Sequence, residues 1–295
     1  MNKKKFVICI GAEKAGTTTL HALFESHLDV LTAFEKETGF FYDDARFEHG
    51  FSWYIDTYFS GADEHQFLFE ADPNYGYFGK CIERICGHIP DARIIFILRN
   101  PVHRAFSQFL MMKKWGLEPL DFEHACAAEP ERIAKGDWQK GHFGYLDRSN
   151  YLPQIRKVLQ FFPPQQVYFM KFEDFVVDQQ SEYNGVLDWI GLECISNQEE
   201  KHANKSSTSK VQWFSQLIHH PRHRKIRQWI ASVVGKERAL NIKAKLERTI
   251  QSEKKVEKLS PETYTHLWQR FSEDIAEIER LTGLDLQSWN NMSQS

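Results

Sequence analysis

Apolar residues along the chain fall into short continuous runs, and the segments between the runs show helical spacing. Continuous apolar runs are expected of parallel strands that are covered on both faces. We predict such strands at 6–10, 67–69, 93–98 and 167–170. Strands that alternate with helices predict an α/β fold in which a central parallel sheet is flanked by helices. Ligands of such sheets bind beyond the carboxyl ends of the strands.

The remaining segments are predicted from the Gly and Pro residues that bound them and from the spacing of their apolar residues. Residues 30–44 are short, mixed and aromatic, and we expect a loop along the rim of the sheet. The clearest helix begins at Pro261 and stops at Gly283. Residues 115–144 lack clear periodicity and are interpreted as an insertion or lid. We expect a single domain over residues 1–295.

The first predicted strand ends in a glycine turn that opens a helix. Gly11 and Gly16 allow positive φ angles and close backbone approach, and Thr17 begins the helix. The free N–H groups and the positive dipole end of this helix face the turn, which carries Lys14 at its centre. An anion bound there meets several donors and a full positive charge. The turn therefore predicts a site for phosphate or sulfate.

The position of the lysine distinguishes this turn from a Walker A loop. The motif G-x-x-x-x-G-K-[ST] needs Lys directly after the second Gly, whereas Lys14 lies two residues before Gly16. The pattern therefore disfavours ATP hydrolysis. Its spacing, G-x-x-K-x-G-T-T, resembles the phosphosulfate-binding loop of sulfotransferases that use 3′-phosphoadenylyl sulfate (PAPS). The resemblance implies that PAPS contacts Lys14, Ala15, Gly16, Thr17, Thr18 and Thr19.

A second motif follows the predicted strand at 93–98. The stretch Arg-x-Pro-x-x-Arg-Ala-x-Ser, from Arg99 to Ser107, resembles the 3′-phosphate-binding motif of the same sulfotransferases. By this resemblance Arg99 and Ser107 bind the 3′-phosphate, for which the charge-assisted fork of Arg is well suited. Asn100 is placed to cap the next helix. We expect the loops that carry Lys14 and Arg99 to converge on one crevice.

The resemblance extends through most of the chain and is to the heparan sulfate enzymes and many bacterial relatives in particular. Residues 34–41 are similar to the family's Lys-Glu-x-x-Phe-Phe segment, whose Glu is the catalytic base, and the match points to Glu37. One departure is Ala71, which stands where heparan-type members have a Lys that assists catalysis or acceptor binding. This difference argues against carrying over their polysaccharide specificity. Other candidates for the base are Glu35, His21, His103, His142 and His202.

The resemblance implies an enzyme of EC 2.8.2 type that moves a sulfuryl group from PAPS to a hydroxyl or amine of a carbohydrate, lipid or other small-molecule acceptor and releases 3′-phosphoadenosine 5′-phosphate (PAP). Such transfer is an in-line displacement through a loose transition state, so the protein mainly positions the partners and stabilises charge. Lys14 would stabilise the leaving group, Glu37 would take the acceptor's proton, and no metal is required. Two alternatives stay open, a P-loop-type nucleotide kinase and a nucleotide-binding module without catalysis.

Charge is distributed unevenly along the chain. The formal net charge is −3, whereas residues 201–258 hold 15 Lys or Arg against 4 Glu. Apolar residues in this basic helical segment recur near helical spacing, which suits peripheral contact with an anionic membrane. An anionic soluble acceptor and simple packing of a helical pair on the core are the alternatives, and we expect no nucleic-acid partner. Lys205 is a candidate second contact to the 3′-phosphate, with a solvated linker as the other interpretation.

Cysteine usage and the N-terminus bear on the cellular compartment. The 5 cysteines are scattered and form no C-x-x-C pair, so neither a disulfide framework nor a zinc site is indicated. The apolar run at 6–10 is too short for a signal peptide or a membrane span. We therefore expect a cytoplasmic protein, with peripheral binding to a membrane as an option.

Overall fold

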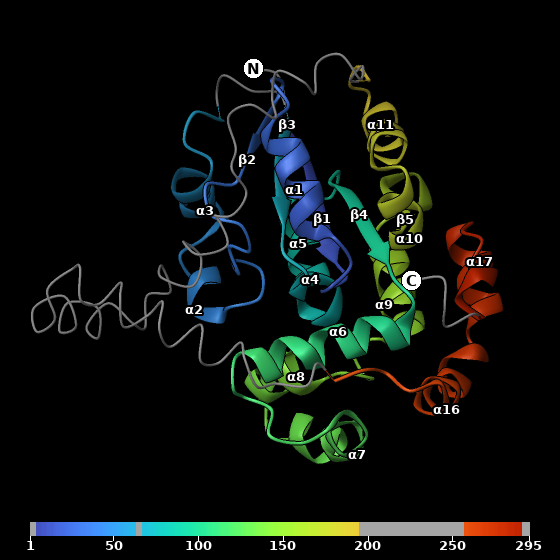
Figure 1. The fold of residues 1–295 in the computed structure, drawn as a ribbon. Helices are drawn as coiled ribbons and strands as arrows, with labels where there is room; N and C mark the ends of the chain where they lie inside the picture. Colours follow the sequence, from blue (N-terminus) through green and yellow to red (C-terminus); the bar gives the residue numbers. More distant parts are fainter. Residues whose placement is uncertain (1–3, 63–66, 195–256, 291–295) are drawn as a thin grey trace, which may run out of the picture. The chain divides into compact units, whose positions relative to one another are not determined.

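The core of the molecule is a parallel 5-stranded sheet with the strand order β2-β3-β1-β4-β5. The structure is a computed structural model that describes residues 4–62, 67–194 and 257–290. The predicted α/β fold, a central parallel sheet flanked by helices, is confirmed (Figure 1). The strands are β1 (Lys5–Gly11), β2 (Val30–Thr32), β3 (Phe67–Ala71), β4 (Arg93–Leu98) and β5 (Val167–Lys171).

The helices alternate with the strands along the chain. With the sheet they form one compact unit, made of Met1–Ile195 and Leu259–Ser295. The described α-helices are α1 (Thr17–Glu25), α2 (Asp44–Phe47), α3 (Phe51–Tyr58), α4 (Asn74–Tyr77), α5 (Lys80–His88), α6 (Pro101–Lys114), α7 (Phe122–Ile133), α8 (Asp137–Phe143), α9 (Tyr151–Phe161), α10 (Phe172–Val177), α11 (Gln179–Ile190), α16 (Pro261–Ser272) and α17 (Ile275–Thr282). The described 3-10 turns are η2 (Pro164–Gln166) and η4 (Gln287–Asn290).

The helices cover both faces of the sheet, and α6 runs across the carboxyl ends of the strands (Figure 1). On one face α1 packs beside α11, where the rings of Phe24 and Tyr183 meet edge to face with centroids 5.2 Å apart. On the other face α4 and α5 pack beside α9. Because both faces are covered, the strand interiors are fully buried, as at Ile8 and Ile95. The loops at the carboxyl ends of the strands are left to form a site.

The start of α6 is the feature that the sequence predicted in most detail. Asn100 accepts hydrogen bonds from the backbone N–H groups of Val102 (3.1 Å) and His103 (3.2 Å), and Pro101 stands at the first helical position. These contacts satisfy two of the N–H groups that a helix leaves without an internal partner. The N-terminus of α6 is therefore fixed directly after β4.

The prediction of a loop over residues 30–44 is wrong at both ends. Val30–Thr32 forms the edge strand β2, which pairs in parallel with β3 from Phe67 to Phe69. A strand of this length carries too little periodicity to be recognised locally, and pairing with β3 is what defines it. The segment ends in α2, where Asp43 caps the backbone N–H of Arg46 at 3.1 Å.

The long C-terminal helix predicted from Pro261 to Gly283 is two helices. α16 ends at Ser272 and α17 begins at Ile275. The break lets the two halves bury their apolar residues in different places, because Leu267 of α16 joins the cluster around α6 and α7, whereas Ile278 of α17 joins the core around the sheet. An unbroken apolar stripe in the sequence could not reveal this change of partner.

Two further predictions concern residues 115–144, which the structure describes in full, and residues 201–258, of which it describes only 257 and 258. Residues 115–144, interpreted as an insertion or lid, contain α7 and α8, and their movement as a lid stays a prediction. The basic segment 201–258, with Lys205 and His202, lies outside the described residues up to position 256. None of the helices in the described ranges combines the length and apolar character that a membrane span requires.

Candidate active site

The turn between β1 and α1 has the backbone geometry of an anion-binding turn. Gly16 has a φ of 81° and Lys14 itself has a left-handed φ of 68°. A hydrogen bond from the backbone N–H of Ala12 to the carbonyl of Ile97 (2.8 Å) ties the turn to β4. Thr18 is exposed in the first turn of α1, where the N–H of Thr19 donates to the Gly16 carbonyl (3.0 Å) and those of Thr17 and Thr18 have no partner within the helix. This helix end is therefore open to an anion.

Lys14 places its ammonium group against α6. Among the described residues its hydrogen-bond partner is the thioether of Met111, with Nζ 3.7 Å from Sδ. Burial lowers the pKa of Lys14, Glu13 opposes this effect, and the nearby guanidinium groups of Arg99 and Arg104 lower it further. A thioether is a weak acceptor. The ammonium is thus partly desolvated and lies among charges of both signs, because Glu37 also raises its pKa.

Arg99 joins the two predicted anion loops. Its Nη1 donates to the backbone carbonyl of Lys14 at 2.9 Å, and its guanidinium lies over the ring of Phe172 with 4.6 Å to the centroid. Its backbone carbonyl accepts a hydrogen bond from the hydroxyl of Tyr151 (2.9 Å). The Nε atom is buried without a hydrogen-bond partner in the described part of the chain. The expected convergence of the loops after β1 and β4 is therefore observed, and Arg99 keeps donor capacity for a ligand.

Ser107 lies within α6, two turns beyond Arg99. Its side chain is half-buried and makes no hydrogen bond to any residue that the structure describes. It is on the same helix as Met111, which contacts Lys14. Ser107 and Arg99 thus lie on one continuous segment, and their shared contact with a 3′-phosphate stays a prediction.

Two buried arginines, Arg104 and Arg148, stabilise the segments that carry the two anion loops. The sequence analysis assigned no role to either. Arg104 is fully buried and donates to Ser149 Oγ (2.6 Å), Gln108 Oε1 (2.9 Å) and the Tyr145 carbonyl (2.5 Å). Arg148 Nη1 lies 2.7 Å from Glu13 Oε2, and its Nη2 donates to the Pro73 carbonyl at 2.8 Å. Arg104 is the second Arg of the Arg-x-Pro-x-x-Arg motif. It is bonded within the protein and does not face a ligand.

The predicted base, Glu37, lies on the loop that connects β2 to α2. It has a left-handed φ of 62°, and its backbone N–H donates to the carbonyl of Ala71 at the end of β3 (3.2 Å). Its carboxylate forms an ion pair with Lys36. The Glu37 side chain is 47% exposed and the Lys36 side chain only 7%. The Glu37 carboxylate is therefore exposed to solvent, whereas the Lys36 side chain that pairs with it is buried.

A buried acidic network supports this loop, and sequence analysis did not find it. Glu70 accepts hydrogen bonds from Thr38, Tyr54 and Tyr75, and burial raises its pKa. Asp72 is also buried, and burial together with the nearby carboxylates of Glu37 and Glu70 raises its pKa to about 7. The only sequence signal was that two carboxylates flank Ala71, the position at which the chain departs from heparan-type members.

The histidines proposed as alternative bases are placed less favourably. His21 is near Lys36 and Glu37, and burial followed by Lys36 lowers its pKa to about 4, so its imidazole is no stronger a base than a carboxylate. His103 packs against Tyr264 with ring centroids 5.2 Å apart. His142 stacks on Trp138 with centroids 4.2 Å apart. His202 lies outside the described residues. Glu37 stays the predicted base, and Glu35, exposed on the same loop, stays its alternative.

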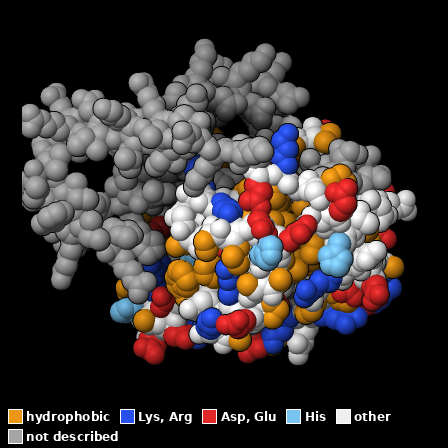
Figure 2. All heavy atoms as spheres, turned by 60° about the horizontal axis from the view of Figure 1, so that its bottom comes forward, with side chains coloured by type: hydrophobic (Ala, Val, Ile, Leu, Met, Phe, Trp, Pro, Cys, Tyr) orange, Lys and Arg blue, Asp and Glu red, His pale blue; other side chains and the backbone are white. Residues whose placement is uncertain are grey.

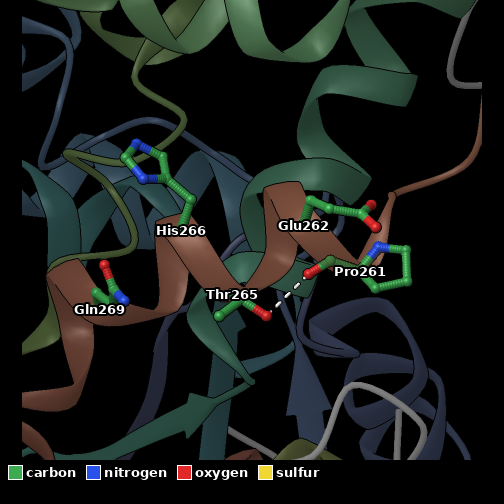
Figure 3. A pocket seen from close by; sticks show the side chains of 5 residues that line it. All are labelled: Pro261, Glu262, Thr265, His266 and Gln269. Carbon is green, nitrogen blue, oxygen red and sulfur yellow. Dashed lines mark hydrogen bonds between the residues drawn. The ribbon is translucent and has the colours of Figure 1, made fainter.

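Two surface hollows lie away from these loops, on α16. One, of about 430 Å³, is lined by Pro261, Glu262, Thr265, His266 and Gln269. Figure 3 shows that the side chains of Glu262 and His266 point apart and that Thr265 bonds to the Pro261 carbonyl (2.9 Å). The second, of about 770 Å³, also touches α7. Neither contains a residue of the anion loops, so we do not assign the reaction to them.

The parallel sheet, flanked by helices and with the β1–α1 turn at its carboxyl edge, is a P-loop-like fold. The chain belongs to the sulfotransferase family, whose family model matches residues 43–196. This range contains Arg99 and Ser107, whereas Lys14 and Glu37 lie before it.

Curated relatives and solved structures agree with this assignment. The chain is 28% identical to the Homo sapiens heparan sulfate glucosamine 3-O-sulfotransferase 3B1 over 204 residues, covering 68% of this chain and 49% of that protein. It is 30% identical to the Mus musculus heparan sulfate glucosamine 3-O-sulfotransferase 6 over 193 residues, covering 64% and 52%. The chain therefore spans about half the length of these relatives. The crystal structure of a sulfotransferase from Alicyclobacillus acidocaldarius superposes with a TM-score of 0.70 at 21% identity, covers 99% of this chain and 100% of that one, and shows the same fold.

Proposed function

We propose that the protein transfers a sulfuryl group from PAPS to a hydroxyl or amine of a carbohydrate, lipid or other small-molecule acceptor, and releases PAP. The observation that carries the proposal is the junction of the two anion loops, in which Arg99 Nη1 bonds the carbonyl of Lys14 at 2.9 Å. One nucleotide with phosphates at both its 5′ and 3′ positions can engage both loops at once. Membership of the sulfotransferase family supports the same reaction.

PAPS is assigned to the two loops because they carry positive charge and hydrogen-bond donors that have no partner among the described residues. The 5′-phosphosulfate lies at the N-terminus of α1, held by Lys14 and by the loop residues Ala15, Gly16, Thr17, Thr18 and Thr19. The 3′-phosphate is bound by Arg99 and Ser107, the first with a buried and unpartnered Nε among the described atoms. Lys205 remains a proposed second contact to this phosphate.

The reaction forms a bond from the acceptor oxygen or nitrogen to sulfur and breaks the bond from sulfur to the bridging phosphate oxygen. Lys14 stabilises the negative charge that develops on this leaving oxygen. Glu37 takes the proton of the acceptor, because its exposed carboxylate lies on a loop that β3 holds in place. The electron pair of the broken bond leaves with PAP. These steps use only side chains of the chain, the donor and the acceptor.

The acceptor is proposed only by class. The curated relatives are named for glucosamine in heparan sulfate. By the resemblance described above, heparan-type members have a Lys at the position of Ala71, which is buried in this protein. On the face seen in Figure 2, acidic and basic side chains are interspersed, and the described residues in that view form no continuous basic patch. We therefore do not restrict the acceptor to a sulfated polysaccharide.

Nucleotide preference separates this function from a nucleotide kinase. We expect PAP to raise the unfolding temperature more than ADP or ATP does at equal concentration. A ligand at a hundred times its dissociation constant stabilises the folded state by about 2.7 kcal/mol, which a thermal shift detects easily. A larger shift with ADP or ATP would contradict the proposal. A binding module without catalysis is distinguished by PAPS consumption, which should exceed background when acceptors are added.

Arg99→Ala should weaken PAP binding by about 2–3 kcal/mol, or about 30- to 150-fold in Kd, the scale of a charge-assisted hydrogen bond. Binding of ADP, which lacks the 3′-phosphate, should change little. Isothermal titration with both nucleotides measures this difference. The matched control is Arg93→Ala at the other end of β4, where the guanidinium bonds the Gln165 carbonyl at 2.6 Å and should leave PAP binding intact. Equal weakening for both nucleotides would remove Arg99 from the 3′-phosphate site.

We also propose peripheral contact of the basic segment with an anionic membrane, in a protein that works in the cytoplasm. The wild type should then sediment with phosphatidylserine-containing vesicles at low salt, and not with pure phosphatidylcholine vesicles. Changing Arg222, Arg224, Lys225 and Arg227 to Gln should reduce the sedimented fraction. If the wild type stays in the supernatant with the anionic vesicles, the segment does not bind membranes and should be tested against soluble polyanions.

A further inference from the structure

Three consecutive residues at the end of β3 hold three consecutive residues of the loop that carries Glu37. The loop residues are Glu37–Gly39, and the residues that hold them are Glu70 and Ala71 of β3 and Asp72 directly after this strand. In loop order the contacts are the Glu37 N–H to the Ala71 carbonyl (3.2 Å), the Thr38 hydroxyl to the Glu70 carboxylate, and the Gly39 N–H to Asp72 Oδ2 (3.0 Å). Both Glu37 and Gly39 have left-handed φ angles, of 62° and 65°. Such a turn holds its shape only when its surroundings fix it.

Asp72 makes the polar contact that closes this turn. Its carboxylate is 1% exposed and accepts three hydrogen bonds, with no ion pair among the described residues. Oδ1 accepts from the backbone N–H (2.9 Å) and the side-chain amide (3.0 Å) of Asn74, and Oδ2 accepts from Gly39. Every contact needs an acceptor on Asp72, and the two oxygens face different partners. A form with a proton or an amide nitrogen on Oδ2 would turn a donor toward the Gly39 N–H.

We propose that Asp72 is a positioning residue for the Glu37 base and that sulfuryl transfer requires Asp72 in its carboxylate form. This inference rests on the proposed function, because it gives Asp72 a role through Glu37. The carboxylate accepts from Gly39 and Asn74 at the same time through two charged oxygens, whereas a protonated Oδ2 is a donor and a weaker acceptor. When Oδ2 is protonated, the Glu37–Gly39 turn loses one of its three anchors to β3, and the base moves relative to the acceptor.

The surroundings of Asp72 give the proposal a distinctive dependence on pH. Its charged and titratable neighbours are Lys36 and Glu37 on the loop, Glu70 on β3, Tyr54 on α3, Tyr75 on α4 and Cys81 on α5. Burial comes first among the causes that raise its pKa, from 3.8 to about 7, followed by Glu37 and Glu70, and Lys36 acts in the opposite direction. Transfer should therefore increase as the pH rises through about 7 and Asp72 ionises.

Stability should change in the opposite direction. A carboxyl group whose pKa is raised on folding stabilises the folded state fully below its unfolded pKa, and this contribution is lost as the pH rises through the folded pKa. For Asp72 the loss extends from about pH 4 to about pH 7. An aspartate with a structural role alone would make the rate follow stability. Asp72 in the proposed role makes the rate increase while stability decreases.

The central experiment compares Asp72→Asn with the wild type. The variant should lower single-turnover release of PAP from PAPS by about tenfold to a hundredfold at pH 8, the cost of a misplaced catalytic group. PAP affinity, measured by titration calorimetry, should stay within about twofold because Asp72 touches neither anion loop. The rate should lose its dependence on pH near 7. The matched control is Asp43→Asn, which keeps a good N-cap on the same loop and should preserve both the rate and its pH profile.

Two measurements test the proposal even without turnover. Hydrogen–deuterium exchange of residues 33–42 should accelerate in Asp72→Asn, and in the wild type as the pH falls through 7 after correction for intrinsic exchange rates. Thermal unfolding of the wild type should show lower stability at pH 8 than at pH 5.5, and this difference should shrink in the variant. If the variant does not fold, the wild-type rate and stability profiles decide the matter alone.

The proposal is overturned if Asp72→Asn keeps the wild-type rate and pH profile, if its losses in rate and PAP affinity are equal, or if exchange of residues 33–42 is unchanged. The proposed function fails in other ways, through absent PAP binding or through full activity of Glu37→Gln. A protein that binds PAP and needs Glu37 but tolerates Asp72→Asn would keep its function and refute only this inference.

Discussion

Lys14→Ala should lower the rate of sulfuryl transfer by about 10²- to 10³-fold, the effect of removing a group that stabilises a developing oxyanion. The structure gives the reason. Among the described residues the Lys14 ammonium has a thioether as its hydrogen-bond partner, with Nζ 3.7 Å from Met111 Sδ, and Arg99 and Arg104 lower its pKa whereas Glu13 and Glu37 raise it. The ammonium forms no ion pair with a described carboxylate, so it can stabilise the negative charge that develops on the leaving oxygen. The measurement is single-turnover PAPS consumption.

The same variant should bind PAP with only a modest loss. The N-terminus of α1 and Arg99 still contact the nucleotide, so the interaction that is lost acts mainly in the transition state. Met111→Leu is the matched control, because it keeps the packing beside Lys14 and removes only the sulfur contact. We expect it to be nearly as active as the wild type. Equal losses of rate and PAP affinity in Lys14→Ala would show that Lys14 acts as a binding residue.

Glu37→Gln should reduce transfer by about 10²- to 10⁴-fold, the range for loss of a general base. The amide is nearly isosteric and keeps the backbone bond from Glu37 to Ala71, but it cannot take the acceptor's proton. PAP affinity should be unchanged, because Glu37 lies on a separate loop that is anchored to β3 and is not part of either loop that binds the nucleotide. Transfer rate and PAP titration, measured on the same preparation, test both statements.

Glu35→Gln is the control for this prediction. Glu35 is exposed on the same loop, two residues before Glu37, and it has the same charge, so its variant reports any general effect of losing one carboxylate. We expect it to keep wild-type activity. If Glu35→Gln were inactive and Glu37→Gln fully active, the base would be Glu35. If both were active, His21 would be the next group to change, because Lys36 and Glu37 of this loop both shift its pKa.

The parts of the site that sequence analysis found are those that local chemistry encodes. Gly16, Lys14 and the start of α1 form one contiguous turn, and their residue types dictate positive φ angles and free N–H groups. The Asn100 cap of α6 is equally local. The meeting of the two loops followed from a general property of parallel sheets, whose strands all end at the same edge.

The parts that were missed depend on contacts between distant segments. β2 is recognisable only once β3 is beside it, and the division into α16 and α17 appears only once their separate packing partners are known. The pairing of Asp72 with Gly39 spans 33 residues of sequence. From sequence alone, a carboxylate after a strand is interpreted as a turn residue, because the loop that it anchors is distant in the chain. Burial of Arg104 was hidden for the same reason.

The most direct test of the central claim is the fate of the sulfuryl group. PAPS labelled with sulfur-35 should be incubated with a cell extract that supplies acceptors, with the wild type and with Lys14→Ala. The account predicts a labelled product formed in equal amount with PAP by the wild type and almost none by the variant. Unchanged PAPS, or label released at the same rate by both proteins, would contradict it.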